Sequence, residues 1–332
     1  MANYIRNQDP RLALATLLAS FVAACGGGGG ASPPPAPPSL PPVNAEELPI
    51  DGDNAQIIAG SVLGSIVAPI ELLELANILG VQPLTDPTDS PVLITGPINL
   101  PPGPGILVND DLACVAGRIS MVWDDVDNST TVSTGDIIGS GFVRCEYTDP
   151  AVMLDGGMSF SDFEITGDPF ARITPWQFAA TYNFVDTAAI TDAVIIRTDG
   201  DLRLDISSDD NLLIGSSVDS TLLTITEGTD IEMLSNFSHT QSFDLNTLVR
   251  TITADGTYTN TSLNGSVTFE TRDPFIVMGE DNPSAGALFI SDNQSSVLIT
   301  AIDNANAQLE VDFNLDMIVD LTLTVPWNTI GL

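Results

Sequence analysis

The sequence predicts a mainly β fold: one antiparallel, meandering sheet with a single N-terminal helix packed on it. From about Leu112 to the end of the chain, apolar and polar residues alternate with the period of two that is typical of strands. Turn-forming pairs interrupt this alternation at short intervals, so little room remains for the crossover helices that parallel strands require. The pattern does not distinguish an open sheet from a sandwich or a half-barrel.

Five residue pairs mark the hairpin turns that we expect in this sheet. Aspartate, asparagine and glycine adopt the positive φ values of tight hairpin turns more readily than other residues do. Such pairs lie between strand-like stretches at Asp155-Gly156, Asp199-Gly200, Asp255-Gly256, Asn264-Gly265 and Asp292-Asn293. Each pair is therefore predicted to join two neighbouring strands.

Residues 1–24 have the character of a signal peptide. Arg6 and Arg11 make the leader positively charged, and the apolar run from Leu12 to Ala23 is too short to span about 30 Å of hydrocarbon. The run ends in Val22-Ala23-Ala24-Cys25, which resembles the lipobox of bacterial lipoproteins.

This resemblance implies that Cys25 is acylated and becomes the first residue of the mature protein, so that a lipid anchor makes the membrane a partner. In the lipoprotein family, aspartate after the acylated cysteine favours retention in the inner membrane, and here Gly26 takes that place. The resemblance thus implies an outer-membrane lipoprotein whose body is periplasmic or surface-exposed. Residues 25–52 begin with five glycines and continue with a proline-rich run, and they are predicted to be the tether.

Composition argues against two classes of partner. The chain has 44 acidic and 9 basic residues, a formal charge of -35 and no lysine, so nucleic acid and anionic lipid surfaces would both repel it. Because the acidic residues are dispersed among apolar ones, we expect a folded body in which they serve solubility.

The helix is predicted over residues 53–81. Asp53-Asn54-Ala55-Gln56 is a variant of the capping box, and apolar residues follow at helical spacing as far as Leu79. Pro69 should kink or divide this helix, and Glu71 and Glu74 argue against a membrane span. Residues 82–112, rich in proline and glycine, are expected to connect the helix to a β domain over residues 113–332.

Cys114 and Cys145 are predicted to form a disulfide, since they are the two remaining cysteines of a chain expected in an oxidising compartment. A catalytic thiol would need an activating base, and the chain offers one histidine, His239. His239 is expected to be an exposed or hydrogen-bonded strand residue, because no G-x-S-x-G motif accompanies it.

Residues 311–325 alternate almost strictly, which predicts one long extended strand. The same stretch is similar to the calcium loops of dockerin and thrombospondin repeats, written D-x-D-x-D-G-x-x-D, with candidate ligands at Asp312, Asn314, Asp316 and Asp320. Ca²⁺ could be held only if the backbone curled sharply, and Met317 stands in place of the motif's glycine. We expect the strand, with a calcium site as the alternative. Asp124, Asp125 and Asp127 are expected to form a hairpin tip.

No phosphate loop, zinc spacing or dinucleotide fingerprint occurs in the sequence. The pattern Pro283-x-x-Gly286-x-Leu288-x-Ile290, with Trp327 near the end, resembles the C-terminal region of uncharacterised Gram-negative envelope lipoproteins, which implies a location and no chemistry. We expect a non-catalytic structural or binding protein whose partner is an envelope protein or a glycan. The alternatives are a carrier of an apolar ligand in a curved sheet and a hydrolase that uses two carboxylates.

Overall fold

The computed structural model describes residues 48–74, 105–109, 115–127, 133–148, 151–168, 173–190, 195–279 and 282–330. They form one α-helix, α3 (Ala55–Glu74), a short 3-10 helix, η2 (Trp327–Thr329), and the strands β1 (Gly105–Asn109), β2 (Ala116–Asp124), β3 (Ile137–Thr148), β4 (Ala151–Asp168), β5 (Ile173–Ile190), β6 (Ile195–Ser208), β7 (Leu213–Glu227), β8 (Asp230–Asp244), β9 (Val249–Asn260), β10 (Gly265–Met278), β11 (Ala285–Ser291), β12 (Ser296–Ala301), β13 (Asn306–Asp312) and β14 (Leu321–Pro326).

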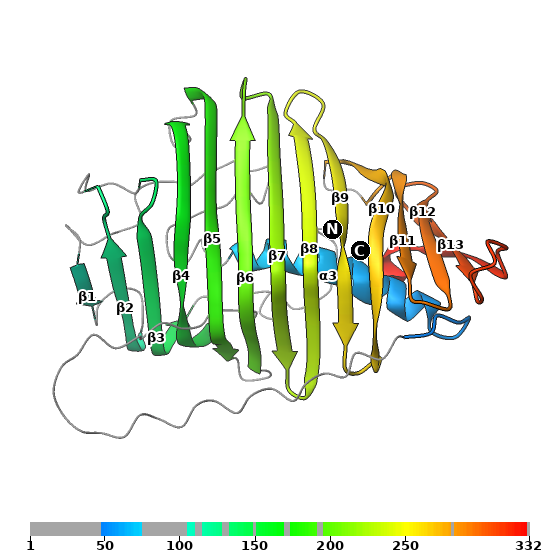
Figure 1. The fold of residues 1–332 in the computed structure, drawn as a ribbon, viewed down its shortest axis with the longest axis horizontal. Coiled ribbons are helices and arrows are strands. Elements are labelled where there is room, and N and C mark those ends of the chain that lie inside the picture. Colours follow the sequence, from blue (N-terminus) through cyan, green and yellow to red (C-terminus); the bar gives the residue numbers. More distant parts are fainter. Residues whose placement is uncertain are drawn as a thin grey trace.

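The fourteen strands of the described chain form a single sheet in which each strand pairs with its neighbours in sequence. All pairings are antiparallel, and β1 does not pair with β14, so the sheet is an open meander (Figure 1). The predicted mainly β fold is confirmed, and of the architectures that the sequence left open the open sheet is the one observed. β1 lies within the segment that we expected to be a connection.

The predicted helix corresponds to α3, which continues through Pro69 as one helix. Residues 75–81, the signal peptide and most of the tether lie outside the described residues. Among the described helices, none combines the length and the apolar character that a membrane-crossing helix needs.

α3 lies across one face of the sheet, which we call the inner face (Figure 1). It contacts β9, β12 and β13 through one buried side, made of Ala55, Ile58, Ala59, Val62, Leu63 and Ile66. These residues recur every three or four positions, as expected for a helix that covers an apolar sheet. Leu204, Ile252, Leu288 and Ile299 are among the inner-face residues that complete the core.

Three of the five predicted turns are wrong. Asp155-Gly156, Asp199-Gly200 and Asp255-Gly256 lie inside β4, β6 and β9, whereas Asn264-Gly265 and Asp292-Asn293 lie at turns as predicted. The three glycines have φ values of 105°, 128° and 157°, and register shifts occur beside them.

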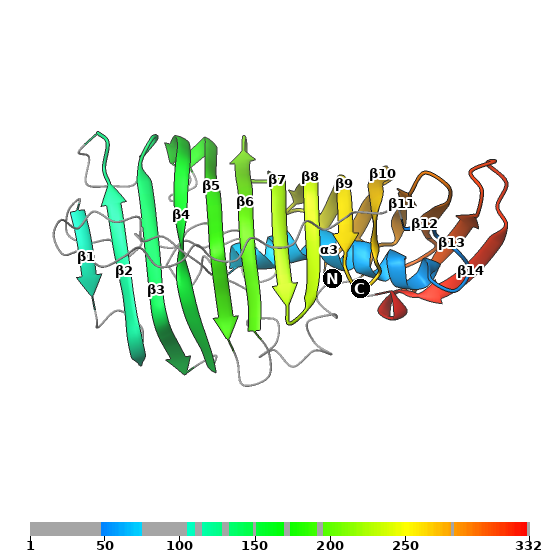
Figure 2. The ribbon, with the colours of Figure 1, turned by 60° about the horizontal axis from the view of Figure 1, so that its bottom comes forward.

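A β-bulge places two residues of one strand opposite one residue of its partner, and glycine allows the positive φ that this needs. At Gly200 a Cβ atom would lie 2.0 Å from the carbonyl oxygen of Leu222 on β7. The Asp-Gly pairs therefore mark points where long strands bend. Figure 2 shows the sheet curling at its C-terminal end, where β12 and β13 meet α3.

We predict that Gly200→Ala destabilises the protein by at least about 2 kcal/mol, because the added methyl group meets the backbone of β7 and the positive φ becomes strained. Gly139→Ala is the matched control, since no atom lies within 4 Å of the Cβ position of Gly139 on β3. Urea unfolding of the two variants checks this. Equal midpoints would show that the bulge at Gly200 does not require glycine.

Candidate functional site

On the outer face, opposite α3, strands β9 and β10 separate in the middle of their length. Their pairing holds at one end, up to Tyr258 and Val267, and resumes at Ile252 and Phe275, with a register break between. Inside the break the hydroxyl of Thr271 accepts a hydrogen bond from the Ala254 N–H (2.8 Å) and donates one to the Ala254 carbonyl (2.9 Å). A side chain thus replaces a backbone pair, and the strands stay apart.

A groove with a volume of about 400 Å³ lies at this separation. This volume falls in the range of about 300–1,000 Å³ that is common for small-molecule sites. Its lining combines two carboxylates, an amide, hydroxyl groups and two phenylalanines: Asn236, Asp255, Gly256, Thr257, Thr268, Phe269, Glu270, Phe289 and Ser291. The sequence analysis missed this groove, because it depends on a register between strands that local patterns do not encode.

The groove is electronegative. The pKa of the Asp255 carboxyl is raised, first by partial burial and then by the neighbouring carboxylates of Asp219 and Glu270. Arg272 forms an ion pair with Glu270, and its guanidinium lies 4.7 Å from the centre of the Phe289 ring. Because one arginine faces three carboxylates, the groove favours neutral or positively charged ligands.

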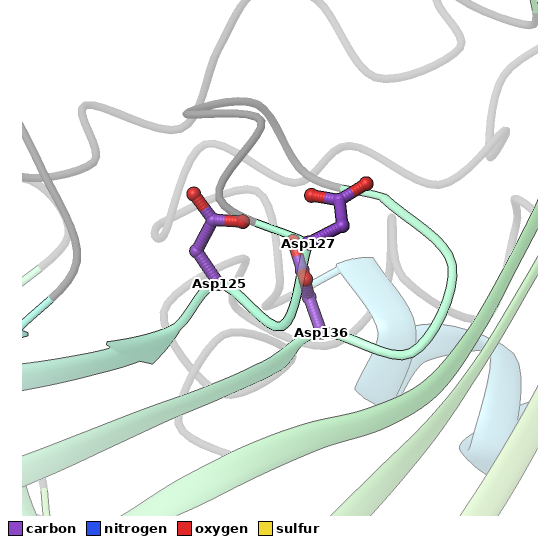
Figure 3. A group of neighbouring side chains, drawn as sticks. All are labelled: Asp125, Asp127 and Asp136. Atoms are coloured by element: carbon purple, nitrogen blue, oxygen red, sulfur yellow. The ribbon is translucent and has the colours of Figure 1, made fainter.

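A second acidic group lies in the connection between β2 and β3 (Figure 3). Carboxylate oxygens of Asp125, Asp127 and Asp136 lie within 4.8 Å of one another, and the first and last of these residues are buried. Asp136 accepts hydrogen bonds from the backbone N–H groups of Val126 and Ser133, both at 3.0 Å. The carboxylates could hold a cation. The sequence analysis placed Asp125 and Asp127 in a hairpin tip, and no sequence pattern pointed to Asp136 as their neighbour.

The long strand predicted over residues 311–325 is wrong. β13 ends at Asp312 and β14 begins at Leu321, and the intervening chain curls. Leu315 and Met317 have φ values of 57° and 66°, in the left-handed region. Period-two alternation alone therefore did not determine an extended backbone here, since the polar residues of the pattern bind the backbone of the loop.

The four predicted calcium ligands lie in this curl. Each accepts a hydrogen bond from a backbone N–H close by in the loop: Asp312 from Asn314 and Met317, Asn314 from Asp316, Asp316 from Ile318, and Asp320 from Phe313. The sharp backbone curl that a calcium site would need is therefore present, with Met317 in the left-handed conformation at the position of the motif's glycine. Calcium binding here stays a prediction.

His239 is buried on the inner face, so the expectation of an exposed or hydrogen-bonded histidine is wrong. The cause is a bulge: Asn236 on β8 has φ 48°, and the inner-face positions shift from Leu234 to Phe237 and His239. Within the described residues neither ring nitrogen has a hydrogen-bond partner. Burial lowers the pKa of His239 to about 4.

Cys145 on β3 is disulfide-bonded. Cys114 and Cys25 lie outside the described residues, so the pairing with Cys114 and the acylation of Cys25 stay predictions.

We predict that His239 makes stability depend on pH between about 6.5 and 4. The unfolded chain protonates this imidazole near its ordinary pKa of 6.5, whereas the folded chain does so only near 4, so the unfolded state binds the proton first as the pH falls. The loss from pH 7 to pH 4 is about 3 kcal/mol.

His239→Leu fills this buried position with an apolar side chain and removes the imidazole that titrates. Urea unfolding of both proteins at pH 7 and pH 4 isolates the effect, because the carboxylates contribute equally to each. Identical pH dependence in the two proteins would contradict the assignment.

Comparison with known proteins finds no match for this chain among protein-family models, curated proteins or solved structures, so its function has to be argued from the residues above.

Proposed function

We propose that the chain is a non-catalytic binding protein of the cell envelope whose outer groove holds a glycan. The observation that supports this proposal is the hollow between β9 and β10, in which hydroxyl, amide, carboxylate and aromatic groups line one open volume. Sugars present hydroxyl groups that such polar residues can hydrogen-bond, and apolar C–H surfaces that the half-buried Phe289 can cover, whereas Phe269 belongs to the core.

The charge of the groove narrows the class of glycan. The carboxylates of Asp219 and Glu270 lie close enough to Asp255 to raise the pKa of its carboxyl group. An anionic sugar would add a further negative charge, whereas a neutral sugar or an amino sugar would not. We therefore propose neutral and amino-sugar oligosaccharides as the ligands.

The dimensions favour a small ligand over a protein partner. A stable protein–protein interface buries about 1,600 Å² in total, and a groove of about 400 Å³ is closer in scale to one or two sugar rings. A carrier role has less support. The cavity between α3 and strands β7 to β9, lined by Ser65, Leu223 and Glu232 among others, has a volume of about 10 Å³, which is room for about one water molecule and far below the usual range for ligand sites.

Hydrolysis of a glycan is the second candidate, because the raised pKa of Asp255 beside Glu270 is the pattern of a general acid next to a second carboxylate. Binding is favoured, since both side chains are exposed on the outer face. A general acid usually owes its high pKa to a site from which water is excluded.

The Cys25 anchor is the second part of the proposal. We expect radiolabelled palmitate to enter the wild-type chain and not Cys25→Ser, and the variant to leave the membrane fraction that holds the wild type. An unlabelled wild-type chain would remove the anchor and leave the groove proposal intact.

For the groove, we expect Asp255→Asn to weaken oligosaccharide binding by about tenfold or more, the usual effect of removing a charged hydrogen-bond partner. Asp199→Asn is the matched control, because Asp199 is an exposed carboxylate of the same face on β6 and does not line the groove. Calorimetry with chito-oligosaccharides, their deacetylated forms and oligogalacturonate measures affinity and charge preference together.

If only oligogalacturonate binds, or if both variants bind like the wild type, the groove is not the site. Release of new reducing ends by the wild type, lost in Asp255→Asn, would move the assignment from binding to hydrolysis.

A further inference from the structure

The loop between β13 and β14, residues 313–320, exposes an unusual run of apolar side chains. Five of its residues are large and apolar, with exposed fractions as follows: Phe313 42%, Leu315 38%, Met317 95%, Ile318 65% and Val319 47%. Single exposed apolar residues are ordinary, but a contiguous group on a soluble body commonly marks a surface that contacts a protein or a membrane.

The backbone of this loop is held in place, so the exposure is part of the fold. Asp312 accepts hydrogen bonds from two backbone N–H groups of the loop, and Asp320 accepts one from Phe313 at 2.8 Å. Leu315 and Met317 both adopt left-handed backbone conformations, which bulky residues take only where surrounding contacts fix them. The side chains of Asn314, Asp316 and Asp320 accept hydrogen bonds from the loop's own backbone and are exposed beside the apolar side chains.

The loop also lies where the tethered end of the chain enters the fold. The Leu48 N–H donates to the Ser266 carbonyl (3.2 Å) and the Ile50 N–H donates to the hydroxyl of Ser295 (2.6 Å). These bonds fix the first described residues to the sheet edge that carries the β9–β10 and β11–β12 turns. Figures 1 and 2 both show this dark blue segment at the end of the sheet that carries the red loop.

Gly52 in this segment lies beside the loop. A Cβ atom built on Gly52 would lie 3.8 Å from Cζ of Phe313 in the loop and 3.3 Å from Cδ2 of Leu321 at the start of β14. Residues 26–47 separate this edge from Cys25, and a proline-rich spacer of that length, at about 3.1 Å per residue, reaches at most about 70 Å. An acyl chain on Cys25 would therefore hold the body within reach of the bilayer by the end of the sheet that carries the loop.

We propose that the β13–β14 loop inserts its apolar side chains into the surface of the membrane to which Cys25 ties the chain. This inference rests on the proposed lipid anchor and is independent of the glycan groove. The bilayer surface it fits is zwitterionic, because the exposed carboxylates of Asp316 and Asp320 in the loop and the overall charge of -35 oppose contact with anionic lipid. The loop would act as a second attachment, which orients the body as well as holding it.

The test places a tryptophan at the tip of the loop by Met317→Trp in the full lipidated chain. Met278→Trp is the matched control, because Met278 is 58% exposed at the opposite end of the strands. Both proteins are reconstituted in phosphatidylcholine vesicles with brominated acyl chains. We expect M317W to add blue-shifted emission that bromine quenches by at least about half, and M278W to add emission that bromine leaves unchanged.

Two further arms make the result decisive. Adding I318D and V319D to M317W should abolish the quenching while palmitate labelling persists, and phosphatidylglycerol vesicles should reduce the quenching of M317W.

Equal quenching of M317W and M278W in palmitate-labelled protein would overturn the loop proposal and leave the anchor proposal standing. A photo-crosslinker at position 317 that captures a protein rather than lipid in cells would also overturn it. Absence of the palmitate label, with M317W still quenched when the protein is added to vesicles, would overturn the anchor alone.

Discussion

The structure depends on long strands that bend within one continuous sheet. β4 and β5 have 18 residues each, and strands of that length need local irregularities to follow the twist of a sheet. β-Bulges supply these irregularities, and most of them contain a residue with positive φ. Glycine fills this role at 117, 156, 200 and 256, and aspartate or asparagine fills it at 162, 186 and 236.

The same bends explain part of the acidic composition. A bulge leaves backbone N–H groups without a partner in the ladder, and short carboxylates can accept them. Asp155 accepts from Arg144 N–H (3.4 Å) and Asp201 accepts from Thr221 N–H (3.2 Å), each across a register shift. In turns, backbone N–H groups lower the pKa of Asp210 and of Asp303 in the same way. Many of the 44 acidic residues therefore have a local structural role beside solubility.

These bulges also separate what the sequence could predict from what it could not. The sheet class, the helix from Ala55 and the β11–β12 hairpin, which pairs Leu288 with Ile299, follow from periodicity and capping. An Asp-Gly pair, however, suits a bulge as well as a turn, because both need positive φ. A bulge also explains why His239 is buried and not exposed. One inserted residue at Asn236 moves the residues that follow it on β8 to the opposite face of the sheet. The groove could not be predicted from local sequence patterns. It forms because the pairing of β9 with β10 breaks register and the Thr271 side chain bridges the two strands at the break.

The two proposed surfaces constrain each other through the geometry of the sheet. The loop lies beyond the end of β13, and Ser296 at the same edge pairs with Asp312. Thr268 and Ser291, which line the groove, pair with each other near this edge, and Thr268 is three residues from the start of β10. A body whose loop touches lipid therefore turns the groove-bearing edge of the sheet toward the bilayer. A glycan in the groove would then be one attached to the membrane or layered directly on it, because a free polymer would have to approach the lipid surface to reach Asp255.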